Sequence, residues 1–240
     1  MGPEALALTR MLGGMRDRWA TFDCYGTLVD WPSGVRDTLQ RLWPEVDGDV
    51  LLEAYMRLEP LVQRGRGIPY REVMAETTAQ VASELGLKVP EGQAQALTTA
   101  LPSWRVFPET PRSLQELRDR GWKLAILSNT DPDLLDASIS AIGVEIDERV
   151  VASDIGSYKP AFGHWETFFK RTGSERERHV HVAASLFHDI EPCAKLGLPA
   201  VWIDRLGEES MVPRTSTLPD LVALPETLER LVPGQRSEDL

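Results

Sequence analysis

Short apolar runs recur along the chain, and in its second half they alternate with segments of helical periodicity. Nearly continuous apolar runs of this length are typical of strands that are buried on both faces of a parallel sheet. Because helical segments connect the later runs, the pattern favours a doubly wound α/β domain. It predicts strands over residues 19–23, 123–129, 149–154, 179–185 and 200–204.

The stretch between the first and second predicted strands has a different pattern. Residues 31–103 contain no strand-like run, and their apolar residues recur at helical spacing. An insertion directly after the first strand lies over the carboxyl ends of the strands, where open α/β sheets bind ligands. We therefore predict a core of residues 16–30 and 104–235, a helical cap subdomain of residues 31–103, and disordered ends at residues 1–15 and 236–240.

Composition narrows the classes of protein. The chain has 240 residues, of which 42% are hydrophobic, as expected for a globular protein with a sizeable core. Its formal net charge of -11 disfavours a nucleic-acid partner, and no apolar stretch approaches the roughly 20 residues that a membrane helix needs. Cys24 and Cys193 lack metal-site spacing, so we expect two reduced thiols in a cytoplasmic protein.

Polar side chains follow several of the predicted strands. Asp23 ends the first strand, Ser128 and Asn129 end the second, and Asp189 follows the fourth, while Lys159 lies between the third and fourth. Each residue alone is usually a turn residue, a cap or a surface charge. Because the carboxyl ends of parallel strands meet at one edge of a sheet, we expect these side chains to converge on one site.

Four motifs around these residues resemble those of the haloacid dehalogenase superfamily, in the same order. They read "DCYGTLVD", "LAILSN", "SYKP" and "SLFHD". The resemblance extends from about residue 18 to 232 and implies a Rossmann-like core with a cap inserted between the first and second motifs. It also implies that Asp23 is a covalent nucleophile.

Two positions depart from the phosphatases of this superfamily. Those enzymes use a second aspartate as general acid, and they hold Mg²⁺ with the nucleophile, a backbone carbonyl at that second position and an aspartate of the fourth motif. Here the general-acid position is Tyr25, whose phenol has an ordinary pKa of about 10 and is a poor proton donor at neutral pH. The Gly-Asp pair of the fourth motif aligns with Ala184 and Ser185, so a metal-ligand carboxylate is missing. We therefore expect no metal and no cofactor.

The first motif, Asp-x-Tyr-Gly-Thr, is similar to that of the 2-haloacid dehalogenases. In that branch the aspartate displaces a halide from the carbon next to a carboxylate, and the resulting ester is then hydrolysed. Expulsion of a halide needs neither a proton nor a metal. The resemblance implies a hydrolase of small 2-substituted carboxylates, most simply 2-halo acids, with the catalytic residues Asp23, Lys159, Asp189 and Ser128.

The substrate would contact both the core and the cap. The resemblance implies contacts from Tyr25, Thr27, Asn129 and Ser185, with Thr27 also bonding to the nucleophile, while Arg57 and Tyr70 are candidates from the cap. Other positions differ from the best-known dehalogenases, which carry a serine, an asparagine and a tyrosine where this chain has Ala184, Leu186 and Trp165.

Three alternatives stay open at this point. The chain can be a related hydrolase that attacks the same carbon, such as one that opens the ring of azetidine-2-carboxylate. The chain can also be a Mg²⁺-dependent phosphatase that tolerates Tyr25 and Ser185, or an idle member that only binds a metabolite or partner. The expected partner is a small carboxylate, without nucleic acid or membrane, and the family suggests a homodimer.

Overall fold

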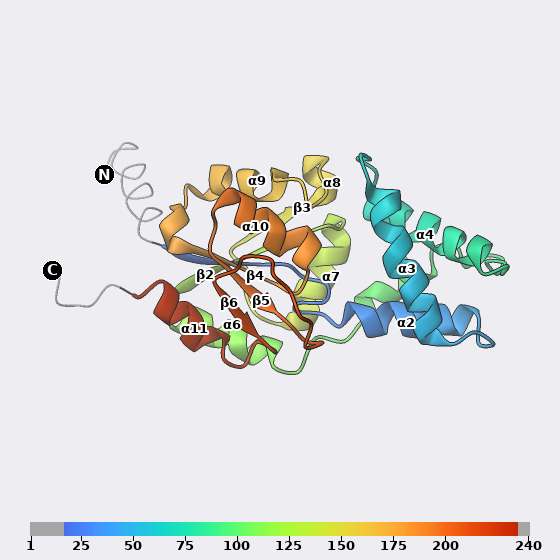
Figure 1. The fold of residues 1–240 in the computed structure, drawn as a ribbon, viewed down its shortest axis with the longest axis horizontal. Helices are drawn as coiled ribbons and strands as arrows, with labels where there is room; N and C mark the ends of the chain where they lie inside the picture. The colour runs from blue at the N-terminus through green and yellow to red at the C-terminus, as the bar shows by residue number, and fades with distance from the viewer. Residues whose placement is uncertain (1–16, 235–240) are drawn as a thin grey trace.

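The computed structural model describes residues 17–234 and contains a parallel sheet of six strands in the order β3-β2-β1-β4-β5-β6. Helices cover both of its faces, with α8, α9 and α10 on one side and α6 and α11 on the other (Figure 1). The predicted α/β class is confirmed. The strands are β1 (Arg18–Phe22), β2 (Trp122–Ser128), β3 (Glu148–Val151), β4 (His179–Ala183), β5 (Ala200–Ile203) and β6 (Ser216–Leu218).

Alternation along the central strands explains the two hydrophobic layers. In β2, Leu124 and Ile126 pack into one cluster of buried residues, while Ala125 and Leu127 face the other. Both layers need helices above them, because each face of a buried parallel sheet is apolar. The covering helices are α6 (Thr110–Asp119), α7 (Pro132–Ile142), α8 (Ala152–Ile155), α9 (Gly163–Thr172), α10 (Glu191–Leu196) and α11 (Leu224–Leu231).

The sheet differs from the predicted pattern in two places. The strand expected over residues 149–154 ends at Val151, because Ala152–Ile155 turns into a short helix closed by Gly156 at a φ of 62°. The edge strand Ser216–Leu218 was not predicted, since its three residues are partly exposed and include two with hydroxyl side chains. No helix in residues 17–234 has the length and apolar character needed to span a bilayer.

Residues 31–103, between β1 and α6, form a separate group of helices beside the sheet, which we call the cap (Figure 1). Gly34, in the first of these helices, lies close against the Trp104 ring, since an added Cβ would be only 2.4 Å from it. The last α-helix of the cap is short and begins at Ala96. They are α2 (Trp31–Leu42), α3 (Gly48–Gln63), α4 (Tyr70–Glu84), α5 (Ala96–Ala100) and the 3₁₀ turn Leu101–Ser103.

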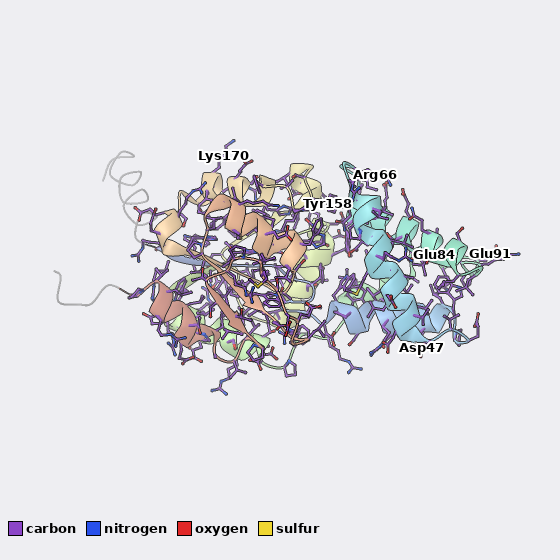
Figure 2. The ribbon with its side chains drawn as sticks, in the orientation of Figure 1. Asp47, Arg66, Glu84, Glu91, Tyr158 and Lys170 are labelled. Carbon is purple, nitrogen blue, oxygen red and sulfur yellow. The ribbon has the colours of Figure 1, made fainter. Side chains whose placement is uncertain are left out.

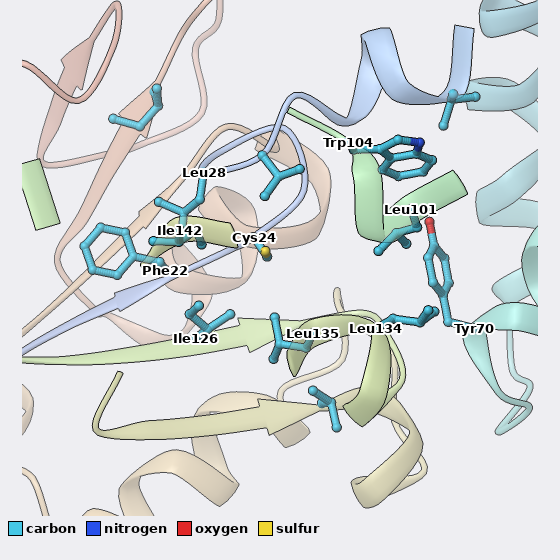
Figure 3. Packing of buried hydrophobic residues seen from close by; sticks show 14 of the residues in the cluster. Phe22, Cys24, Leu28, Tyr70, Leu101, Trp104, Ile126, Leu134, Leu135 and Ile142 are labelled. Carbon is cyan, nitrogen blue, oxygen red and sulfur yellow. The ribbon is translucent and has the colours of Figure 1, made fainter. Parts of the chain in front are cut away.

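Cap and core share one hydrophobic cluster. Tyr70, Leu101 and Trp104 from the cap side belong to the same buried cluster as Leu134 of α7 (Figure 3). Tyr158 lies where the core meets the cap (Figure 2) and donates a hydrogen bond from its hydroxyl to the carbonyl of Ile68 at 2.8 Å.

A carboxylate of the core also holds the cap. Asp131 precedes α7 at the position expected for an N-cap, but its side chain makes no capping bond to that helix. Its oxygens instead accept the backbone N–H groups of Tyr70 at 2.8 Å and Arg71 at 3.1 Å, at the start of α4, and the Arg71 Nε at 2.9 Å. The residue therefore caps a helix of the other subdomain. The disordered ends expected from the sequence lie outside the described residues.

Candidate active site

Lys159 joins two carboxylates at the carboxyl edge of the sheet. Its side chain is 1% exposed, and Nζ lies 2.8 Å from Oδ1 of Asp23 and 2.7 Å from Oδ1 of Asp189. The third ammonium proton goes to the carbonyl of Leu127 at 2.8 Å. All three donors of the lysine are therefore in use, and three distant segments converge as the parallel strands predict.

The turn after β1 orients Asp23. Gly26 supports this turn with a φ of 90°, a left-handed conformation that favours glycine. The Thr27 hydroxyl donates to Asp23 Oδ2 at 3.0 Å and accepts the Ala184 N–H at 2.9 Å. Thr27 is buried and does not line the cleft, so the substrate contact expected for it is corrected: it positions the carboxylate instead.

Burial and charge act in opposite directions on the two acids. Burial raises the pKa of Asp23, and the charge of Lys159 opposes this rise without cancelling it. Burial would also raise the pKa of Asp189, but the charge of Lys159 and the hydrogen bond from His181 outweigh it and hold this pKa well below its usual range. The lysine keeps its proton, because the two carboxylates outweigh the effect of burial and raise its pKa.

A buried polar chain continues from Asp189 into the sheet. His181 Nε2 lies 2.9 Å from Asp189 Oδ1, and the Thr21 hydroxyl lies 2.8 Å from both His181 Nδ1 and His179 Nε2. Because a carboxylate only accepts, His181 donates a hydrogen bond from Nε2 to Asp189, and its Nδ1 accepts one from the Thr21 hydroxyl. Sequence reasoning missed this chain, although the alternating histidines in "HVHVA" place both rings on one face of β4.

The second motif supplies the hydroxyl of Ser128, which is free among the described residues, and the amide of Asn129, which is hydrogen-bonded to the backbone of Lys159. Ser128 lines the cleft, and its buried Oγ has no hydrogen-bond partner within residues 17–234. Asn129 accepts the Lys159 N–H at 2.7 Å and donates to the Lys159 carbonyl at 3.0 Å. The asparagine side chain therefore holds the lysine segment in place, whereas the serine is available to a ligand.

Tyr25 and Ser185 both line the cleft, in different ways. The Tyr25 hydroxyl lies 3.2 Å from Ser138 Oγ, and burial raises its pKa well above the usual value, so the phenol is a neutral wall. Ser185 Oγ accepts the His188 N–H at 3.1 Å and closes the turn Leu186–Ile190. His188 Nε2 is buried without a partner among the described residues.

The cleft between core and cap has a volume of about 380 Å³. Tyr70 lines it, and the Tyr70 hydroxyl donates to Glu59 Oε1 at 2.7 Å. Sequence reasoning did not select Glu59; the one available signal was an acid on the apolar face of an amphipathic segment. The cap residues of the lining are Trp31, Pro32, Met56, Glu59, Pro60, Gln63 and Tyr70.

The placement expected for Arg57 is corrected by the structure. Helix α3 turns Met56, Glu59, Pro60 and Gln63 toward the cleft, at the spacing of one helix face. Arg57 is one residue out of phase, and its side chain is 54% exposed and paired with Glu84. It therefore does not line the cleft.

The magnesium site of the superfamily's phosphatases does not fit these residues. Position 185 carries a hydroxyl in place of a carboxylate ligand, and Lys159 already bridges the two remaining carboxylates. Within residues 17–234, no group of three or more His, Cys, Asp or Glu side chains is arranged to hold a metal ion. The side chains of this site therefore differ from the set of magnesium ligands in those phosphatases.

Known haloacid dehalogenases are similar to this chain in sequence and in fold. The chain is 31% identical to haloacetate dehalogenase H-2 of Moraxella sp. (strain B) over 192 residues, covering 78% of this chain and 85% of the relative. A solved L-2-haloacid dehalogenase superposes with a TM-score of 0.81 at 23% identity, over 90% of this chain and all of the other. The L-2-haloacid dehalogenase of Xanthobacter autotrophicus with chloropropionic acid covalently bound superposes with a TM-score of 0.78 at 21% identity. The superposition covers 89% of this chain and 98% of the other.

The sequence profile of the haloacid dehalogenase-like hydrolases matches residues 18–197, three quarters of the chain. This match covers all four motifs and the buried triad of Asp23, Lys159 and Asp189. The chain is therefore a hydrolase and belongs to the haloacid dehalogenase-like family.

Proposed function

We propose that the protein is a metal-independent hydrolase of small 2-halo carboxylates that works through an aspartyl ester. The observation that carries the proposal is the contact of Lys159 with Asp23 and Asp189 at the base of a cleft that has no carboxylic acid at position 25. Such a site can expel a leaving group that needs no proton, and halide is the simplest one.

The free donors at the strand ends support binding of a carboxylate. The Ser128 hydroxyl and the backbone N–H groups of Tyr25 and Asn129 have no hydrogen-bond partner within residues 17–234. A substrate carboxylate that accepts these donors would present its α-carbon to Asp23. Charge-assisted hydrogen bonds of this kind are stronger than neutral ones, so the net negative chain does not prevent binding.

The reaction then has two steps. An Asp23 oxygen attacks the carbon that bears the halogen, a carbon–oxygen bond forms, and the halide leaves with the bonding electrons. Water next attacks the ester carbonyl of Asp23, which restores the carboxylate and releases a hydroxy acid and a proton. Asp189 Oδ2 has no partner within residues 17–234 and is available to orient this water.

One set of assays tests the proposal. Both enantiomers of 2-chloropropanoate and a general phosphate ester are offered to the protein, with chelator and with added Mg²⁺. We expect chloride release that chelator leaves unchanged, and phosphate release at background. Mg²⁺-dependent phosphate release without chloride release would overturn the proposal in favour of a phosphatase. The homodimer, the absence of a nucleic-acid partner and the cytoplasmic location stay predictions.

A further inference from the structure

The cap contributes one acidic side chain to the inner wall of the cleft. Glu59 lies on α3, lines the cleft and is only 7% exposed. Its Oε1 accepts the Tyr70 hydroxyl at 2.7 Å and, more weakly, the Tyr55 hydroxyl at 3.5 Å. Its Oε2 has no hydrogen-bond partner within residues 17–234. A buried carboxylate with one free oxygen thus borders the space in which a substrate would lie.

No protein cation neutralises this carboxylate within the described residues. Among the cleft-lining residues the only cationic side chain is Lys159, and its three donors are already used. Arg64 lines a neighbouring cleft of about 270 Å³, without an ion pair to Glu59. Buried carboxylates are usually paired, because burial of an unpaired charge is costly. In agreement, burial raises the pKa of Glu59 to about 7.

We propose that Glu59 determines specificity by binding an ammonium group of the substrate, which would make the preferred substrate a 2-substituted carboxylate with a protonated amine on its side chain. The proposal rests on the proposed function for the chemistry at Asp23. The substrate carboxylate would meet the free donors of the core, and the ammonium group would meet the acid of the cap. The ammonium group of such a zwitterion would supply the positive charge with which Glu59 is not paired within the described residues.

The two tyrosines prepare Glu59 for this role. By donating to Oε1, Tyr70 and Tyr55 stabilise its charged form and leave Oε2 free for a ligand donor. A methyl group in place of the ammonium would leave that oxygen desolvated and unpaired. Hydrogen-bonding sites reject analogues that lack the donor for this reason.

Binding of unreactive ligands tests the inference independently of turnover. The probes are 3-aminopropanoate, 4-aminobutanoate and 5-aminopentanoate, each compared by calorimetry at pH 8 with the isosteric butanoate, pentanoate or hexanoate. We expect at least one amino acid to bind the wild-type protein about tenfold or more tightly than its isostere. Glu59→Gln should abolish this preference and leave the affinity for the alkyl acids within about twofold, because the ammonium contact alone is lost.

The Glu59→Gln variant also distinguishes a role of Glu59 in binding the ammonium group from a purely structural role in the cap. Its amide oxygen can still accept the Tyr70 hydroxyl, so a merely structural Glu59 would leave the ligand preference intact. Glu84→Gln changes an exposed acid of the same cap and is the matched control, for which we expect the wild-type preference. Equal binding of both ligand series by the wild-type protein, a preference that survives in Glu59→Gln, or no amino-acid binding would overturn the inference.

Turnover of 2-chloropropanoate distinguishes this inference from the proposed function. Chloride release without an ammonium preference refutes the role of Glu59 alone. A Glu59-dependent preference without chloride release supports the recognition site and refutes the halide chemistry.

Discussion

The two walls of the cleft use their polar atoms differently. On the core wall, Lys159 has three acceptors, Asp23 is held at both oxygens, and Asn129 is locked to the lysine backbone. On the cap wall, Gln63 and several apolar and aromatic side chains surround one acid, Glu59, with one free oxygen. The core wall is thus built to hold a reacting carboxylate in one geometry, and the cap wall is built to select what enters.

The difference follows from the elements that carry each wall. On the core wall, Asp23 follows β1 directly and Ser128 ends β2, so the paired strands fix where these two side chains begin. The cap wall is one face of α3 together with the starts of α2 and α4. A change of side chain on a helix face alters the shape and charge of the wall without disturbing the sheet. Substitutions on the core wall should therefore affect catalysis, and those on the cap wall should affect selectivity and stability.

The largest effect is expected at the nucleophile. Asp23→Asn should reduce turnover by about 10³-fold or more, because an amide is a far weaker nucleophile than a carboxylate. A single turnover of the wild-type protein in heavy-oxygen water should place the label in Asp23 before it reaches the product. Substantial activity in the folded Asn variant would remove Asp23 from the mechanism.

The next effect is expected at the lysine. Lys159→Met should lower turnover by about 10²-fold and move the acidic limb of the pH profile upward, because the charge of Lys159 is the strongest influence that opposes the rise in the Asp23 pKa caused by burial. Lys123→Met, which changes a partly exposed lysine paired with Asp147, should leave both quantities unchanged. If the acidic limb stays in place in Lys159→Met, Lys159 does not control the ionisation of Asp23.

A third prediction concerns stability and the cap wall. The pKa of Glu59 is about 7 in the folded protein and ordinarily 4.5, so the folded protein binds more protons between these values and loses stability as pH rises through them. Glu59→Gln removes this loss and should be more stable than the wild-type protein by roughly 1–3 kcal/mol at pH 8, but by less than about 1 kcal/mol at pH 5. Chemical unfolding at the two pH values measures the difference. An identical difference at both would show that Glu59 titrates normally.

The smallest effect is expected at Arg57. Arg57→Ala should change turnover and KM by less than about twofold, because exposed ion pairs contribute little and the side chain does not line the cleft. A large rise in KM would mean that the cap rearranges on binding and brings Arg57 to the substrate.

Much of the fold could be predicted because its strands are short and almost wholly apolar. The exceptions are informative: β6 is a polar edge strand, and the helix Ala152–Ile155 follows β3 without a break in the apolar run. The convergence of Asp23, Lys159 and Asp189 followed from the parallel topology. Arg57 was misplaced because a shift of one residue on α3 turns a side chain by about 100°. The roles of Glu59 and His181 could not be predicted, because they depend on contacts with Tyr70 and Asp189, which are separated from them in the sequence.

The bond between Asp131 and the start of α4 links motion of the cap to the shape of the cleft. Tyr70 gives its backbone N–H to Asp131 and its side-chain hydroxyl to Glu59. If the cap swings away from the core to release a product, the first turn of α4 must leave Asp131. Tyr70 then loses its backbone hydrogen bond to Asp131, and the same residue holds Glu59 through its hydroxyl. Gating and selection are then coupled mechanically through one tyrosine, so a change at Asp131, outside the cleft lining, should alter both the rate of opening and the choice of ligand.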